Sequence, residues 1–201
     1  MPEQPGMRAP TQLRIMAAAL ATLVATAPAA AAPPPAPPAA SEIRFGASDI
    51  PTVFYISKSD GRNRVDYGMR LNDSCAPINN DAVFPYWRDF EHSPPVRTHA
   101  LGMFARLGYG ISEQRLVHGG KPDAAYEVRL KQFKQRPVWI TSKRDADGHC
   151  RSLARCAIAG LRFAELLSIY VKLAGPLSVE YIIVKGRNLE TGKLIEERVE
   201  N

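Results

Sequence analysis

Tyrosine, tryptophan and arginine side chains are the residues of this 201-residue chain whose types best suit ligand chemistry. Aromatic rings stack on sugars, and guanidinium groups make paired hydrogen bonds to carboxylates. We predict a binding pocket, placed at one end of a β domain where ligand sites are frequent, from five such residues: Tyr86, Trp87, Arg88, Tyr109 and Arg136. The alternative is that Trp87 and Tyr109 belong to the core and that Arg136 closes the end of a strand.

Positive charge is concentrated between residues 121 and 162. This stretch holds ten Lys or Arg and four Asp or Glu, a net of +6, equal to the net charge of the whole chain. Alternation along predicted strands puts six of the cations opposite the apolar side: Arg129, Lys131, Lys143, Arg151, Arg155 and Arg162. Neighbouring strands would merge them into one basic face, which attracts anions. A solvated face kept charged against aggregation is the alternative.

Motifs for catalysis, metal binding and nucleotide binding are missing from the sequence. The four histidines (His92, His99, His118 and His149) lack the spacing of metal ligands. No Cys-x-x-Cys, Gly-x-Ser-x-Gly or phosphate-binding glycine loop occurs. We therefore predict no catalytic residues, no metal and no cofactor. A hydrolase with a site dispersed along the chain remains an alternative.

The first 40 residues differ in composition from the rest, since they hold nine of the 17 prolines. Arg8 and Arg14 precede an apolar run over 15–27, which small residues follow. This order is typical of a secretory signal, and the run is shorter than the roughly 20 residues that span a bilayer. We predict a signal peptide over 1–31, a Pro/Ala tether over 32–40 and one β-rich domain over 41–201. An uncleaved anchor and a start at Met7 are alternatives.

Export would place the mature domain in the periplasm or outside the cell, with no transmembrane segment after cleavage. The anions available there are lipid headgroups, lipopolysaccharide phosphates and acidic polymers, so we do not expect nucleic acid as a partner. An oxidising compartment also allows a disulfide. Cys150 and Cys156 fall on one predicted strand, about 20 Å apart, too far for a bridge. The possible disulfide joins Cys75 with Cys150 or Cys156, and three unpaired thiols are the alternative.

Alternation of polar and apolar residues with period two dominates the body of the chain. Asp-Gly pairs at residues 60–61 and 147–148 mark hairpin turns. The segment 161–173 could be a helix by composition, but its flanking turns favour a strand. Helical spacing of Leu101, Phe104 and Ala105, after Thr98 as a cap, predicts one short helix near 98–107. The fold class is mainly all-β: an antiparallel barrel or a two-sheet sandwich of eight to nine strands.

Seven segments in order carry a resemblance to a known family: VFYISKSDGRNRVDYG, PYWRDF, LGYGI, EVRLKQFKQRPVWI, SIYV, VEYIIVKG and LETGKLIEERV. They resemble a bacterial exported family catalogued as domain of unknown function 4833, over about residues 50–201. The matching positions are Asn63, Tyr67, Tyr86, Trp87, Tyr109, Gly110, Arg136, Gly160, Tyr170, Tyr181, Gly186, Thr191 and Gly192. The segment HALGMFARL lacks the acidic residue usual there in the family. The resemblance implies an exported β-rich domain and no activity.

Taken together, these observations predict a non-catalytic exported domain that binds an anionic or glycan component of the cell envelope through its basic strand face. The alternatives are a structural or protein-interaction domain of the envelope, and the dispersed hydrolase.

Overall fold

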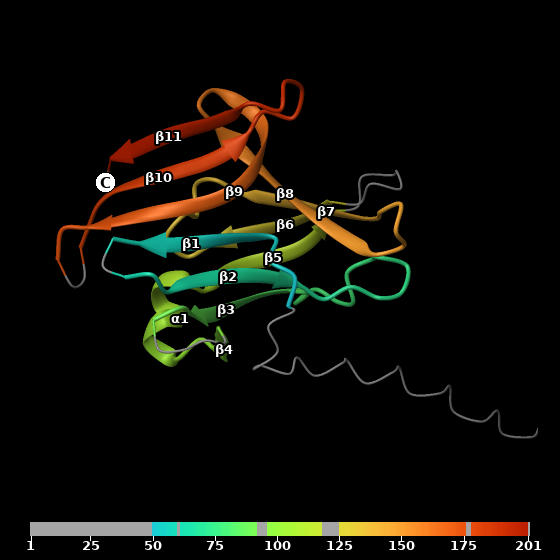
Figure 1. The fold of residues 1–201 in the computed structure, drawn as a ribbon, viewed down its shortest axis with the longest axis horizontal. Coiled ribbons are helices and arrows are strands. Elements are labelled where there is room, and N and C mark those ends of the chain that lie inside the picture. Colours follow the sequence, from blue (N-terminus) through green and yellow to red (C-terminus); the bar gives the residue numbers. More distant parts are fainter. Residues whose placement is uncertain (1–49, 60, 92–95, 118–124, 176–177, 201) are drawn as a thin grey trace, which may run out of the picture. The chain divides into compact units, whose positions relative to one another are not determined.

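The structure is a computed structural model that describes residues 50–59, 61–91, 96–117, 125–175 and 178–200. These residues form a mainly β domain (Figure 1). The predicted signal peptide and tether lie outside the described residues. In the described part of the chain, no helix combines the length and apolar character that a membrane crossing requires.

Eleven strands and one short helix are present among the described residues. The first strands are β1 (Phe54–Lys58), β2 (Arg64–Met69), β3 (Val83–Asp89) and β4 (Arg97–Ala100), followed by the helix α1 (Met103–Tyr109). The remaining strands are β5 (Ile111–Val117), β6 (Ala125–Leu130), β7 (Val138–Arg144), β8 (Cys150–Ile158), β9 (Leu161–Leu173), β10 (Val179–Arg187) and β11 (Leu194–Glu200).

The long strand β9 organises the sheet (Figure 1). β10 pairs along one edge of β9 and carries β11 on its far side. On the other edge, β8 pairs antiparallel with the first half of β9, and β1 pairs parallel with its second half. Two groups of strands are therefore attached to the same edge of β9. We call them the first leaf (β1–β4) and the second leaf (β5–β8).

A β-bulge in β9 lies where the strand passes from one leaf to the other. In the pairing of β10 with β9, Gly186 lies opposite Leu166. The residue before it, Lys185, lies opposite Ser168, so one residue of β9 is left without a partner on β10. The extra residue reverses the alternation, so Leu166 is buried before the bulge and Ile169 after it. A Cβ on Gly186 would lie 2.3 Å from the carbonyl oxygen of Glu165, which explains glycine at this position.

The core lies between the two leaves. Phe54 and Tyr67 of the first leaf stack with ring centroids 4.4 Å apart. The second leaf faces them with apolar side chains that are almost fully buried: Val128, Leu130, Val138, Ile140, Ala154, Cys156 and Ile158. Side chains also join the leaves at the edge away from β9. There the amide oxygen of Gln114 accepts a hydrogen bond from the Val83 N–H (3.1 Å) and contacts the Tyr126 hydroxyl (3.2 Å).

The predicted fold class, mainly β with one short helix, is confirmed. The sheet is mixed and is not closed into a barrel, so the arrangement of leaves resembles the sandwich alternative. It has eleven strands rather than eight to nine, and the β1–β9 pair is parallel. The segment 161–173 is a strand, as expected.

The helix begins later than the spacing predicted. Residues 97–100 form β4, where buried Thr98 pairs with Arg88 of β3 instead of capping a helix. Gly102 precedes the helix and makes no side-chain cap. Local spacing could not reveal that β3 offers a pairing edge to this segment.

A disulfide joins Cys75 to Cys150, one of the two pairings that the sequence allowed, with 5.3 Å between the Cα atoms. It links the loop after β2 to the first residue of β8. Cys156 is a free thiol in the core, and burial raises its pKa to about 12. Such a thiol is protonated and inert at neutral pH.

Candidate functional site: a cationic pocket at the seam

The five aromatic and arginine residues predicted to form a pocket do not converge. Tyr86 and Arg88 are two residues apart on β3 and share its outer side, whereas Trp87 packs against the core on the inner side. Tyr109 is the last residue of α1 and contacts the core. Arg136 lies in the β6–β7 connection and is bound to β11.

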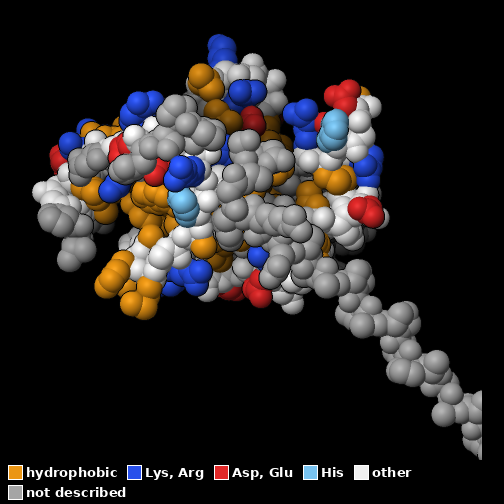
Figure 2. Space-filling view, turned by 60° about the horizontal axis from the view of Figure 1, so that its bottom comes forward, with side chains coloured by type: hydrophobic (Ala, Val, Ile, Leu, Met, Phe, Trp, Pro, Cys, Tyr) orange, Lys and Arg blue, Asp and Glu red, His pale blue; other side chains and the backbone are white. Residues whose placement is uncertain are grey.

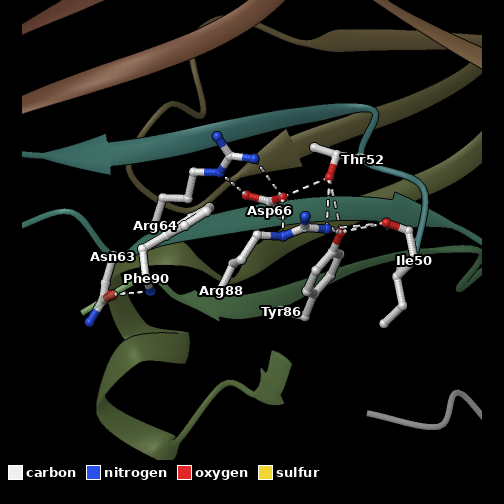
Figure 3. Close-up of polar contacts among 8 residues, drawn as sticks. All are labelled: Ile50, Thr52, Asn63, Arg64, Asp66, Tyr86, Arg88 and Phe90. Carbon is white, nitrogen blue, oxygen red and sulfur yellow. Dashed lines mark hydrogen bonds and ion pairs between the residues drawn. The ribbon is translucent and has the colours of Figure 1, made fainter. Parts of the chain in front are cut away.

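Tyr86 and Arg88 belong to a buried polar network on the outer side of the first leaf (Figure 3). The fully buried carboxylate of Asp66 pairs with Arg64 at 2.6 Å and with Arg88 at 2.9 Å. The Thr52 hydroxyl donates to the same carboxylate at 2.6 Å and contacts the Tyr86 hydroxyl at 3.0 Å. These contacts occupy the polar groups of the network, so we assign it to fold stability.

Arg136 is also fully engaged. Its guanidinium makes two hydrogen bonds to Glu197, at 2.7 and 2.8 Å, and a third to the carbonyl of Ala157. The Glu197 carboxylate accepts a further hydrogen bond from the Ala159 N–H at 2.7 Å. These contacts attach β11 to the turn after β8, and they hold the pKa of Glu197 below its ordinary value, chiefly through Arg136.

Carboxylates interrupt the predicted basic face. Arg129 pairs with buried Glu127 at 2.8 Å, and Arg151 pairs with Asp145. Burial alone would raise the pKa of Glu127, but hydrogen bonds and charges from Arg115 and Arg129 outweigh burial and lower it.

The other four predicted cations have different environments. Arg155 hydrogen-bonds Thr141 and lies opposite Glu165 in the β8–β9 register, but the Glu165 carboxylate is paired with Arg187. Lys143 is exposed beside Arg151, and Arg162 lies over the ring of Phe163. Lys131 lies elsewhere, in the pocket described next.

A pocket of about 370 Å³ opens at the seam, the region where the start of β3, which β4 does not pair, approaches β5 of the second leaf beside α1. We call it the seam pocket, and its lining residues are Arg70, Phe84, Pro85, Ala100, Leu101, Arg106, Gly110, Ile111 and Lys131. Three of these side chains are cationic and none is acidic. None of the three cations makes an ion pair with a carboxylate among the described residues.

Two backbone hydrogen bonds at Gly110 bring two of these cations together. The Gly110 N–H donates to the carbonyl of Arg106 at 3.1 Å, and its carbonyl accepts from the Lys131 N–H at 3.0 Å. A Cβ at this position would lie 2.2 Å from the Arg106 oxygen, so only glycine allows this close approach. The Tyr67 hydroxyl adds a hydrogen bond to the Tyr109 carbonyl at 2.6 Å. The end of α1 is thereby fixed over the core.

The third cation is held by an aromatic ring. The Arg70 guanidinium lies 5.1 Å from the centroid of Phe84 and donates to the carbonyl of Asp81 at 3.3 Å. Phe84 in turn packs over Gly68, where a Cβ would lie 2.8 Å from the ring. The pocket therefore combines fixed positive charge with apolar surface, which suits an anionic group attached to an apolar or sugar-like body.

One group of possible metal ligands occurs in the described ranges. Asp145, Asp147 and His149, in the β7–β8 turn, have ligand atoms within 4.8 Å of one another. Asp145 already accepts hydrogen bonds from the Asp147 and His149 N–H groups and pairs with Arg151. These contacts are those of an aspartate-stabilised turn.

The fold and pocket define a class: a mainly β, sandwich-like domain with one cationic pocket described at its seam. A family model matches residues 54–198, and the chain belongs to that family, Domain of unknown function (DUF4833). Comparisons with the curated proteins and with solved structures give no significant match.

Lys131 alone of the seam cations was among the predicted site residues; Arg70 and Arg106 were missed. Arg106 lies in the helix and Arg70 just after β2, so neither belongs to the alternating strand pattern of 121–162. The sequence signal closest to the seam pocket is Tyr109-Gly110, because a glycine after a short helix indicates a close backbone approach. The convergence of the three cations depends on the approach of the two leaves.

Proposed function

We propose that this domain is a non-catalytic binding module for an anionic ligand and that the ligand binds the seam pocket. The observation that carries the proposal is the set of three cations, Arg70, Arg106 and Lys131, around a pocket without an acidic lining residue. Fixed cations in a concave site attract and orient an anion, and an arginine presents two parallel donors to a carboxylate or phosphate.

The pocket supports an anionic ligand better than the strand face does. On that face Arg129 and Arg151 are already paired with carboxylates, so an incoming anion would have to compete with them. In the seam pocket no such competitor is present among the lining residues. The apolar surface of Phe84 and Pro85 next to the cations would contact the uncharged part of a ligand.

The secretory signal pattern in the sequence supports a place for this function outside the cytoplasm. The Cys75–Cys150 bridge agrees with such a place, because disulfides persist in oxidising compartments. We propose that the ligand is an anionic component of the cell envelope, such as a phosphate-bearing lipid headgroup or an acidic sugar.

The proposal can be tested by NMR titration of the mature protein with inorganic phosphate, glucose 1-phosphate and glucuronate. We expect saturable shifts at the backbone amides of Arg106, Gly110 and Lys131. Arg106→Gln with Lys131→Gln should weaken binding at least tenfold.

The matched control is Arg162→Gln with Lys193→Gln, which removes the same charge from two exposed positions away from the pocket. It should leave the affinity within twofold. Equal weakening by both double variants, or shifts spread over the strand face, would refute a seam site.

A further inference from the structure

The helix α1 exposes large apolar side chains next to the seam pocket. Met103, Phe104 and Leu107 are 74%, 81% and 61% exposed, and no residue of the helix is fully buried. These positions are i, i+1 and i+4, so they share one side of the helix. Ala105 and Tyr109 point the other way and contact the core. The helix thus presents an apolar side to solvent, which we call the α1 apolar patch (Met103, Phe104 and Leu107).

Figure 2 shows the end of the molecule that carries α1 from below. Hydrophobic side chains protrude there, next to Lys and Arg side chains. Exposed apolar side chains that gather at one place mark contact with a partner or a membrane more often than scattered ones do.

The chain segment that carries the α1 apolar patch holds cationic but no acidic residues, although Asp89 of β3 lies opposite its Arg97. Residues 96–112 contain Arg97 and Arg106 but no Asp or Glu. Arg106 lies between Phe104 and Leu107 in sequence and lines the seam pocket together with Lys131. A partner for this surface therefore needs apolar groups beside negative charge.

An anionic phospholipid bilayer has these two properties within a few ångströms, since headgroup phosphates lie directly above acyl chains. Amphipathic helices lie at this boundary with their apolar face buried to a depth of about 5–10 Å. A helix of about two turns with three apolar side chains and flanking cations fits that geometry.

We propose that the α1 apolar patch docks the domain on the surface of an anionic bilayer while the seam pocket binds a lipid headgroup phosphate. The inference rests on the proposed function and adds the source of the anion. Phe104 and Leu107 enter the boundary of the acyl chains, and Arg106 and Lys131 contact the phosphate.

Co-sedimentation of the mature protein with vesicles tests this docking. One set contains phosphatidylcholine with 30% phosphatidylglycerol, and the other contains phosphatidylcholine alone. We expect binding to the anionic vesicles and at least tenfold weaker binding to the neutral ones. Phe104→Ser with Leu107→Ser should lower vesicle binding at least tenfold and leave the phosphate titration unchanged. Arg106→Gln with Lys131→Gln should weaken both.

The control variant is Leu189→Ser with Leu194→Ser, which removes two exposed leucines (45% and 73%) from the β10–β11 hairpin. It should bind vesicles like the wild type. A second measurement uses Phe104→Trp with lipids brominated in the acyl chains. The new tryptophan should be quenched more strongly than Trp87 and Trp139 of the wild type.

The outcomes separate the two proposals. Phosphate binding without vesicle binding would overturn the membrane inference and leave the binding module. If the wild type bound neither phosphate nor vesicles, both proposals would be overturned. Vesicle binding that survives Phe104→Ser with Leu107→Ser, or an unquenched Phe104→Trp, would show that headgroup charge alone acts and would overturn docking by α1. A wild-type dimer that this double serine change converts to a monomer would assign the patch to self-association and would likewise overturn it.

Discussion

Several charged residues of this domain make contacts that stabilise the fold, and these contacts occupy the groups that could otherwise bind a ligand. Asp66 is fully buried and receives two guanidinium groups and a hydroxyl. The guanidinium group of Arg136 makes two hydrogen bonds to the carboxylate of Glu197. The cations of the seam pocket differ because none has a carboxylate partner among the described residues. An arginine available to a ligand differs here from a structural one in its partner rather than in its residue type.

Replacing Asp66 with Asn tests the stabilising role of the buried network. The amide keeps the volume but removes the negative charge, so Arg88, whose side chain is 16% exposed, loses its ionic partner. Breaking a buried pair in this way costs about 3–5 kcal/mol. We expect a loss of that order in the free energy of unfolding from urea titration. Glu200→Gln, at an exposed pair with Arg198, is the control and should leave the midpoint unchanged. A stable Asp66→Asn variant would contradict the assignment.

The Arg136–Glu197 pair predicts a loss of stability in acid. In the folded state the pKa of Glu197 lies below its ordinary value of 4.5, and the largest cause is the hydrogen bonding from Arg136. The unfolded chain therefore takes up this proton at higher pH than the folded chain does. The stabilisation is complete above pH 4.5 and is lost as the pH falls through the lower folded-state pKa.

Urea midpoints measured at pH 7 and pH 3 check this sign. The wild type should lose more stability between the two values than Glu197→Gln, which has no proton to gain. Glu190→Gln, in the exposed β10–β11 turn, should behave like the wild type. Equal acid sensitivity of wild type and Glu197→Gln would show that other carboxylates account for the loss.

The aromatic and arginine residues predicted to share one pocket lie apart in the structure. Tyr86 and Trp87 are neighbours on a strand, and alternation alone puts their side chains on opposite sides of the sheet. Placing both in one pocket conflicted with the same alternation rule that predicted most of the strands. The partner of Arg136 lies 61 residues away in the chain, and no local pattern could indicate it.

Elements in this fold are set by pairing as much as by their own composition. The segment 97–100 follows helix signals but forms β4, because β3 offers an edge with four register partners. The length of β9 has a similar origin: two leaves and β10 all pair with it. Alternation within a segment predicted most of the strands but not β4, because the strands that pair with a segment lie elsewhere in the chain.

The disulfide supplies a prediction about two elements, the β2–β3 loop and β8. It joins residues 75 positions apart, and closing a loop of that length stabilises a fold by about 4 kcal/mol on the chain-entropy estimate. We expect Cys75→Ser with Cys150→Ser to lower the free energy of unfolding by that order. Dithiothreitol should destabilise the wild type similarly and leave the double variant unaffected. Alkylation of the denatured, unreduced protein should label Cys156 alone; labelling at three cysteines would contradict the bridge.

At the scale of the whole molecule, the β class followed from alternation, whereas the shape of the seam did not. The approach of β3 to the second leaf depends on long-range contacts of Tyr126 and Gln114. The parallel β1–β9 pair joins residues more than a hundred positions apart. The seam pocket is a product of that closure, so its three cations are scattered in the sequence at 70, 106 and 131.

Export of the chain can be tested by two covalent changes that it predicts: cleavage of the signal peptide and formation of the disulfide. The sequence predicts cleavage after Ala31, because a charged segment and an apolar run precede small residues at positions 29 and 31. Expressed in a Gram-negative host, the chain should yield a periplasmic or secreted product that begins at Ala32, two hydrogens lighter than the reduced form. Ala29→Phe with Ala31→Phe should block cleavage, since bulky side chains are excluded there. A chain from which residues 1–31 are deleted should stay in the cytoplasm with three labelled thiols. An intact amino terminus on a reduced wild-type protein would refute export and, with it, the envelope as the place where the seam pocket meets its ligand.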